Sequence, residues 1–247
     1  MRLERIAQSL FEQSSTAKHV LGDTYEWEGR IFRYSKAGEA LSKGHILTPL
    51  ATPTYTVDAV ATNTAAEDSL YGRMAISQVV DVADAGATVA AGALAGMMLF
   101  VDDGLGEGQA EWIIGNTAGA SGSSMKIYLA AALTTALTAA GVSDITIYTD
   151  QVVEKAAITS ANQIIVGVAP IAVTKDYYFW RQIYGMCFVL HGGTTAAGLH
   201  IRPGDNTEGQ CLTIVDAEDL YDATPFGAAL SDCPIADTGC VAFVKCW

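Results

Sequence analysis

The sequence predicts a mainly β protein: short antiparallel strands in β-sandwich or barrel-like sheets, one short helix, and an extended N-terminal arm. Two observations support this fold class. From about residue 55 onward, short apolar or alternating runs recur between turn signals, which is the pattern of short strands. Half of the 247 residues are apolar, which is enough to fill a core. Only one stretch has the composition of a helix.

Residues 1–50 are expected to form the N-terminal arm and a β-hairpin. Leu3, Ile6 and Leu10 recur at helical spacing, so residues 2–13 fit either a short helix or an extended arm. No neighbouring segment of the sequence is available to bury this arm. Ordering it costs entropy that a partner surface must offset, so we expect it to dock on a neighbouring subunit.

The hairpin is predicted from the alternation of aromatic and charged residues after Asp23. A two-residue turn at Glu28-Gly29 fits, because glycine supplies the positive φ that hairpin turns need. Trp27 then lies opposite Arg30 on one side of the ribbon, where a cation can stack on the ring. We interpret the stretch as scaffold and predict that it contacts a neighbouring protein through five residues: Tyr25, Trp27, Arg30, Phe32 and Arg33.

Two β-rich domains are expected after the hairpin, residues 51–155 and 156–247. The predicted strands of the first are 75–83, 97–103, 110–116, 123–129 and 144–149. Those of the second are 162–173, 177–184, 185–190, 211–216 and 240–246. The run AAALTTALTAAG at residues 130–141 predicts the short helix near 130–140, with Gly141 as its C-cap.

Charge and hydropathy exclude several partners. There are 14 Lys and Arg against 27 Asp and Glu, a net charge of −13, and a phosphate backbone selects against that balance. The longest apolar runs are too short to span a bilayer. The opening residues lack the apolar segment of a signal peptide. We therefore expect a soluble protein, made in the cytoplasm, that binds neither nucleic acid nor membranes.

The glycine-rich stretch GLGEGQ at residues 104–109 is interpreted as a hairpin loop. Its third glycine is misplaced for a dinucleotide fingerprint, and a strand follows where that motif requires a helix. The spacing of Asp102, Asp103 and Glu107 does not match a calcium loop. Asp205–Gly209 is similarly a polar turn.

No set of catalytic residues is recognisable. His191-Gly192-Gly193 resembles an oxyanion loop, but the chain has no G-x-S-x-G elbow to accompany it. The four histidines lack the spacing of a zinc site. We predict a protein that is not an enzyme and that holds no cofactor or metal.

The five cysteines are predicted to be buried free thiols: Cys187, Cys211, Cys233, Cys240 and Cys246. Their number is odd, and there is no C-x-x-C pair. In one strand, Cys240 and Cys246 would lie about 20 Å apart, too far for a disulfide. The aromatic run at residues 177–180 is expected to supply core and interface residues on alternate strand faces.

Four stretches, taken together, resemble auxiliary head proteins of tailed phages, the decoration or cement proteins of icosahedral capsids. The first is GRIFRYSKAG at 29–38 followed by GHIL at 44–47, similar to a "G-R-x-F-R-Y-x-K-A-G … G-K-L" pattern. The others are residues 97–114, with the D-D-G-x-G-E-G-Q loop; 127–137, with IYL and LTTAL; and 177–190, with YYFWRQIYG. They follow one another in the expected order. Residues 199–239 are richer in Cys, Asp and Pro than that pattern.

The resemblance implies a β-rich, oligomeric, non-enzymatic protein of the outer capsid surface. Its partners would be the major capsid protein and further copies of itself. Such proteins are often trimers at threefold positions, with terminal arms that reach neighbouring capsomers. Net negative charge would keep an outer layer soluble and away from the packaged genome. The alternatives are another virion component, such as a head fibre, tail protein or host-surface adhesin, and a β-barrel ligand-binding module or enzyme.

Overall fold

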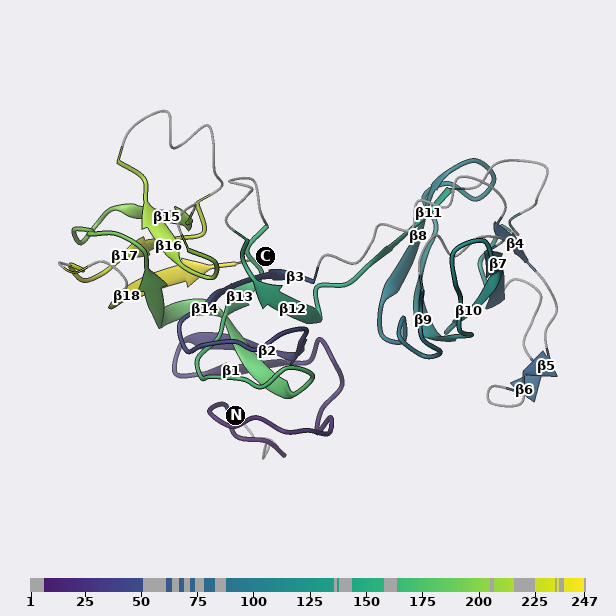
Figure 1. Ribbon diagram of the computed structural model, residues 1–247, viewed down its shortest axis with the longest axis horizontal. Coiled ribbons are helices and arrows are strands. Elements are labelled where there is room, and N and C mark those ends of the chain that lie inside the picture. The colour runs from purple at the N-terminus through teal and green to yellow at the C-terminus, as the bar shows by residue number, and fades with distance from the viewer. Residues whose placement is uncertain are drawn as a thin grey trace. The chain divides into compact units, whose positions relative to one another are not determined.

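A computed structural model describes residues 7–50, 61–63, 67–68, 72–73, 78–82, 88–135, 137, 144–157, 164–204, 207–215, 225–233, 235 and 238–246. Their regular structure is almost entirely β-strand, which confirms the predicted mainly β class (Figure 1). The chain forms two compact units. Unit 1 contains residues 1–50 and 150–247, and unit 2 contains residues 51–149.

This division differs from the three predicted domains. Residues 1–50 do not form a separate part, because β2 (Arg30–Ala37) pairs antiparallel with β14 (Tyr178–His191) and parallel with β12 (Val152–Lys155). The N-terminal strands therefore complete a unit whose other strands follow residue 150. Such long-range pairing leaves no local signal in the sequence.

The strand pairings of unit 1 close into two five-stranded rings that share β14. The first ring runs β2–β12–β3–β13–β14 and back to β2, with β3 at Ile46–Pro49 and β13 at Gly167–Val168. The second runs β14–β16–β15–β17–β18 and back to β14. Its other strands are β15 (His200–Pro203), β16 (Cys211–Thr213), β17 (Gly227–Ala229) and β18 (Thr238–Lys245). Closure leaves few free strand edges in either ring.

Two hydrophobic clusters lie within the rings, and the second includes residues of β3 and β13 from the first ring. The first contains Ala37, Leu41, Leu47, Val153, Val166, Ala169, Val173 and Phe179. The second contains Ile46, Ala156, Ile165, Val168, Val189, Ile201, Cys211, Phe226, Ala229, Cys233, Cys240, Ala242 and Val244. On β18, Cys240, Ala242 and Val244 are buried while the residues between them are exposed. One face of this strand therefore belongs to the core and the other is exposed.

Strand β14 changes partner at Gly185. Its first half pairs with β2 and its second half with β18, and the register shifts between Gln182 and Tyr184. Gly185 has φ +96°, and a Cβ added there would lie 2.9 Å from the carbonyl oxygen of Gly29. Only glycine combines this backbone conformation with so close an approach of the hairpin turn.

The predicted hairpin is confirmed in its register. β1 (Thr24–Trp27) pairs with β2 so that Trp27 lies opposite Arg30 and Tyr25 opposite Phe32. Glu28 and Gly29 both have positive φ, 50° and 72°. Positive φ at both central residues is what a type I′ two-residue hairpin requires.

The N-terminal segment does not extend away from the molecule as expected. Residues 7–23 pack on unit 1, and Leu10 is buried with Phe32, Tyr34 and Trp180. The Tyr34 hydroxyl donates to Gln8 Oε1 at 2.6 Å, and Trp180 Nε1 donates to the Gln8 carbonyl at 3.2 Å. The segment thus covers an aromatic surface and satisfies its polar atoms. Residues 7–13 are not helical, and residues 1–6 lie outside the described residues.

Unit 2 contains a six-stranded antiparallel sheet in the order β11–β8–β9–β10–β7–β4. These strands span Asp144–Tyr148, Met98–Asp103, Ala110–Asn116, Met125–Leu129, Val79–Val82 and Ala61–Asn63. A two-stranded pair, β5 (Glu67–Asp68) and β6 (Gly72–Arg73), is separate. The β8–β9 hairpin confirms that GLGEGQ is a turn and not a nucleotide loop.

The predicted helix at 130–141 is wrong for the part that the structure describes. Residues 130–135 and 137 are irregular, and the remainder of the stretch lies outside the described residues. The Gln109 side chain binds this backbone: its Oε1 accepts from the Thr135 amide at 2.9 Å, and its Nε2 donates to the Thr135 carbonyl at 3.1 Å. Tertiary hydrogen bonds replace the helical ones, and Leu133 and Leu137 enter the core.

Other strand boundaries also changed. The two strands predicted at 177–184 and 185–190 are one continuous strand, β14, which bends at Gly185. Within the predicted strand 162–173, the described residues form only the short β13 and a single bridge at Val173. Strands β3, β12, β15 and β17 had not been predicted, because each is four residues or shorter.

Candidate interaction surface

The second ring of unit 1 carries a row of large apolar side chains on its outer side. Met186 of β14 lies opposite Phe243 of β18, and Phe188 lies opposite Val241. They alternate with buried residues, so they point away from the core. Five side chains that are 36–61% exposed make up what we call the apolar face: Tyr184, Met186, Phe188, Val241 and Phe243.

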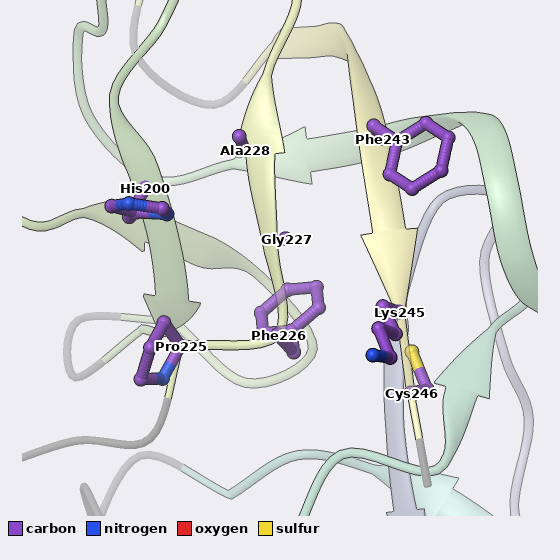
Figure 2. Close-up of a pocket in the computed structure, with 8 residues that line it drawn as sticks. All are labelled: His200, Pro225, Phe226, Gly227, Ala228, Phe243, Lys245 and Cys246. Carbon is purple, nitrogen blue, oxygen red and sulfur yellow. The ribbon is translucent and has the colours of Figure 1, made fainter.

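The apolar face extends over β17 and β15 to a cavity. Ala228 lies opposite Phe243, and His200 lies opposite Ala228. A cavity of about 430 Å³ opens there, and Figure 2 shows Phe226 among its lining residues, with Lys245 on β18. A Cβ at Gly227 would overlap the Phe243 carbonyl, so this glycine allows β17 and β18 to approach closely.

A second cavity of about 320 Å³ lies at the Phe188 end of the apolar face. Lys43 Nζ lies 5.2 Å from the centre of the Phe188 ring, within cation–π range. The ring packs against Gly44, where an added Cβ would be 2.8 Å away. Its position is therefore fixed by contacts that larger residues would not permit. The lining residues are Phe11, Arg30, Lys43, Val168, Pro170, Ile171, Gln182, Cys187 and Phe188.

The charges around the apolar face are positive. Arg30 and Lys43 line one cavity and Lys245 lines the other, and no Asp or Glu lines either of them. Within the described ranges, Lys43 and Lys245 form no ion pair, and Arg30 meets only the exposed Glu28, at 3.5 Å. An exposed pair of this kind contributes little. In a chain of net charge −13, this surface is suited to an acidic, partly apolar partner.

The five residues predicted for the hairpin interface separate into two groups. Phe32 is fully buried, so it presents no surface to a partner. Arg33 forms an ion pair with Asp150 inside unit 1. Burial corrects the prediction for Phe32, whereas the Arg33 side chain stays 30% exposed beside Asp150 and its interface role remains a prediction.

The remaining three residues are partly exposed, as Arg33 is. The Arg30 guanidinium stacks 4.4 Å from the Trp27 ring, as predicted, and also lines the cavity beside Phe188. Tyr25 packs 6.1 Å from Trp180. The tip of the hairpin therefore adjoins the apolar face.

A buried charge cluster holds the framework behind this surface. Arg181 of β14 is fully buried and lies opposite Arg33 of β2. Asp150 bridges the two: its Oδ2 accepts from Arg181 Nη2 at 3.0 Å, and it pairs with Arg33. Burial lowers the pKa of Arg181 to about 10, and the Asp150 carboxylate opposes that shift. One carboxylate thus links two arginines that lie on neighbouring strands.

The five cysteines are all free, as predicted, but only Cys211, Cys233 and Cys240 are buried, and Cys187 and Cys246 are partly exposed. Burial raises the pKa of Cys240 to about 11 and that of Cys246 to about 12. They stay protonated near neutral pH, whereas a nucleophilic cysteine needs a thiolate. Among the described residues, no group of three or more His, Cys, Asp or Glu could hold a metal ion.

Sequence reasoning missed the apolar face, although its signal was present. In YGMCFVL, the large residues Tyr184, Met186 and Phe188 alternate with smaller ones. Both sets are apolar, however, so period-two alternation does not tell which set faces the core.

The chain matches no protein-family model, and no curated protein or solved structure is significantly similar to it. In the part of the chain that the structure describes, there is no helix long and apolar enough to cross a membrane.

Proposed function

We propose that this chain is a structural virion protein that decorates and stabilises an icosahedral capsid by bridging neighbouring capsomers. It is non-enzymatic and lies on the outer capsid surface as a homo-oligomer, a trimer in the simplest arrangement. The observation that carries the proposal is the apolar face. Five large apolar side chains on paired strands remain 36–61% exposed in the part of the chain that the structure describes, and an exposed apolar row of this kind is typical of a protein–protein contact.

The stretches that resemble decoration proteins coincide with framework elements, which supports the proposal. Residues 29–38 form the hairpin turn and β2, and residues 97–114 contain β8, its loop and β9. Residues 177–190 contain most of β14, the strand that both rings share. Arg30 and Phe188 belong to these stretches and also line the cavity at the apolar face.

The test is co-sedimentation of the purified protein with emptied heads of the phage whose genome encodes it. We expect saturable binding, and loss of binding in the double variant Met186→Asp, Phe243→Asp, because two charges would interrupt the apolar face. Ile164→Asp is the matched control, since Ile164 is 54% exposed in unit 1 but lies outside the apolar face. A wild-type protein that does not associate with heads at any concentration would refute the proposal.

A ligand-binding module is the second candidate, favoured by the cavity of about 430 Å³ beside His200 and Lys245. Cavities of this size suit small ligands. A carboxylate-bearing aromatic compound that raises the melting temperature in a saturable way would support it. That shift should disappear in Lys245→Met.

A further inference from the structure

We infer that the apolar face of one copy binds the acidic β8–β9 loop of a second copy, so that the oligomer is built from head-to-tail contacts. This deepens the homo-oligomer of the proposed function and rests on that part of it. We call the loop the acidic tip, defined by Asp102, Asp103, Leu105 and Glu107.

The acidic tip combines charge with an exposed apolar residue. Leu105 is 44% exposed, and the three acidic side chains around it are also exposed. The loop is held in place, because Gln109 Nε2 donates to the carbonyls of Gly106 and Thr135, both at 3.1 Å. An ordered loop loses less entropy on binding than a mobile one.

Charge is distributed unequally between the two units. Unit 2, which carries the acidic tip, has ten Asp and Glu against two Lys and Arg in residues 51–149. Unit 1 contains the other twelve Lys and Arg against seventeen Asp and Glu, and three of these cations, Arg30, Lys43 and Lys245, lie around the apolar face. The apolar face and the acidic tip are therefore complementary in sign, which favours this pairing over other contacts between copies.

Lysines lie at both ends of the apolar face. From Tyr184 to Phe188 the apolar face spans about 13 Å along the strand, with Lys245 beside one end and Lys43 beside the other. In the proposed contact, Leu105 packs on the apolar side chains. The carboxylates on either side of it then meet the two lysines, whose long side chains can adjust.

The same charges argue against a symmetric contact between two apolar faces. Such a dimer would bring Arg30, Lys43 and Lys245 of one copy close to the same residues of the other, and like charges at an interface are unfavourable. A contact between two different surfaces is heterologous, and it closes into a ring when the rotation allows. A trimer is one such ring.

The experiment measures the mass of the full chain in solution by light scattering. The face variant carries Lys43→Glu and Lys245→Glu, and the tip variant carries Asp103→Lys and Glu107→Lys. We expect the wild type to form a discrete oligomer and each variant alone to be monomeric, at the 25.9 kDa chain mass. The charge-matched control is Lys18→Glu with Lys175→Glu, two exposed lysines away from the apolar face, and it should oligomerise like the wild type.

An equimolar mixture of the face variant and the tip variant gives the decisive measurement. The face variant keeps an intact acidic tip, and the tip variant keeps an intact apolar face. One chain of each variant can therefore form a single contact, between that tip and that face. We expect dimers at twice the chain mass and nothing larger. A mixture that stays monomeric, a face variant that still oligomerises, or a monomeric wild type would each overturn the inference.

The proposed function and this inference fail separately. Wild-type chains that assemble head to tail but ignore phage heads would leave the inference standing and remove the capsid role. Chains that co-sediment with heads while both variants remain oligomeric would leave the capsid role and remove the inference.

Discussion

Unit 1 and unit 2 bury different kinds of core. The cluster in unit 2 contains only Val, Leu, Ile and Met side chains. Unit 1 buries Trp180, Phe179 and Tyr34, and with them the charged Arg181 and the imidazole of His191. An aliphatic core requires only packing, whereas buried polar groups each need a specific partner. The stability of unit 1 therefore depends more strongly on individual residues.

The two units also differ in the range of their contacts. In unit 2, β8, β9 and β10 are consecutive in sequence and adjacent in the sheet. In unit 1, β2 pairs with β14, which begins at residue 178, and unit 2 is inserted between them. We expect unit 1 to close more slowly during folding, because long-range pairing must first overcome loop-closure entropy.

The largest expected effect comes from Asp150→Asn. This change removes the only carboxylate between Arg33 and the fully buried Arg181 among the described residues. Breaking a buried pair by removing one partner costs about 3–5 kcal/mol, so the unfolding of unit 1 should shift strongly in calorimetry while that of unit 2 stays in place. Glu26→Gln, an exposed change on β1, is the control. A shift of less than about 1 kcal/mol would show that the cluster is solvated.

Ile127→Ala is the corresponding test in unit 2. Ile127 is fully buried and pairs with both β7 and β9. A large-to-small change in a packed core costs about 2–5 kcal/mol. Chemical denaturation should show this loss in unit 2 with unit 1 unchanged. If both units lost stability equally, they would unfold as one cooperative body and the comparison would fail.

Gly185→Ala should have a smaller effect, of about 2–3 kcal/mol, from positive φ combined with steric overlap. The matched variant is Gly122→Ala in unit 2, where φ is +76° and nothing lies within 4 Å of an added Cβ. It should lose only about 1 kcal/mol. Equal losses in the two variants, measured by denaturant midpoint, would mean that the close approach to Gly29 has no cost.

The smallest effect is a pH dependence restricted to unit 1, which contains all four histidines. Burial lowers the pKa of His191 and, together with Lys155, that of His45. As the pH falls, the unfolded chain therefore binds protons before the folded chain does. The stability that the two neutral imidazoles contribute to the fold is complete above the ordinary pKa of about 6.5. It is lost as the pH falls through that value towards the folded pKa values.

Melting curves from pH 7.5 to 5.5 would check this. The transition of unit 1 should move to lower temperature while that of unit 2 barely changes. The double variant His45→Asn, His191→Asn should flatten the response of unit 1. A wild-type curve that is already flat would show that neither imidazole resists protonation.

Local features could be predicted from the sequence. The hairpin at Glu28-Gly29 and its register followed from turn chemistry and cross-strand pairs, and both are confirmed. The β8–β9 hairpin followed in the same way. In both hairpins, the residues that decide the structure lie within a few positions of one another, so the pattern is complete in one short window. The free thiols followed instead from the odd number and the spacing of the cysteines.

The sequence by itself thus determined the β class, the two hairpins and the unpaired cysteines. Only the tertiary structure decided that residues 7–23 pack on their own chain, that β14 closes two rings, and that 130–135 are not helical. It also decided that Met186 and Phe243 face outwards. These four features have the same physical reason. Each depends on a packing partner that is distant in the sequence. An apolar residue has the same local sequence pattern whether such a partner covers it or leaves it exposed.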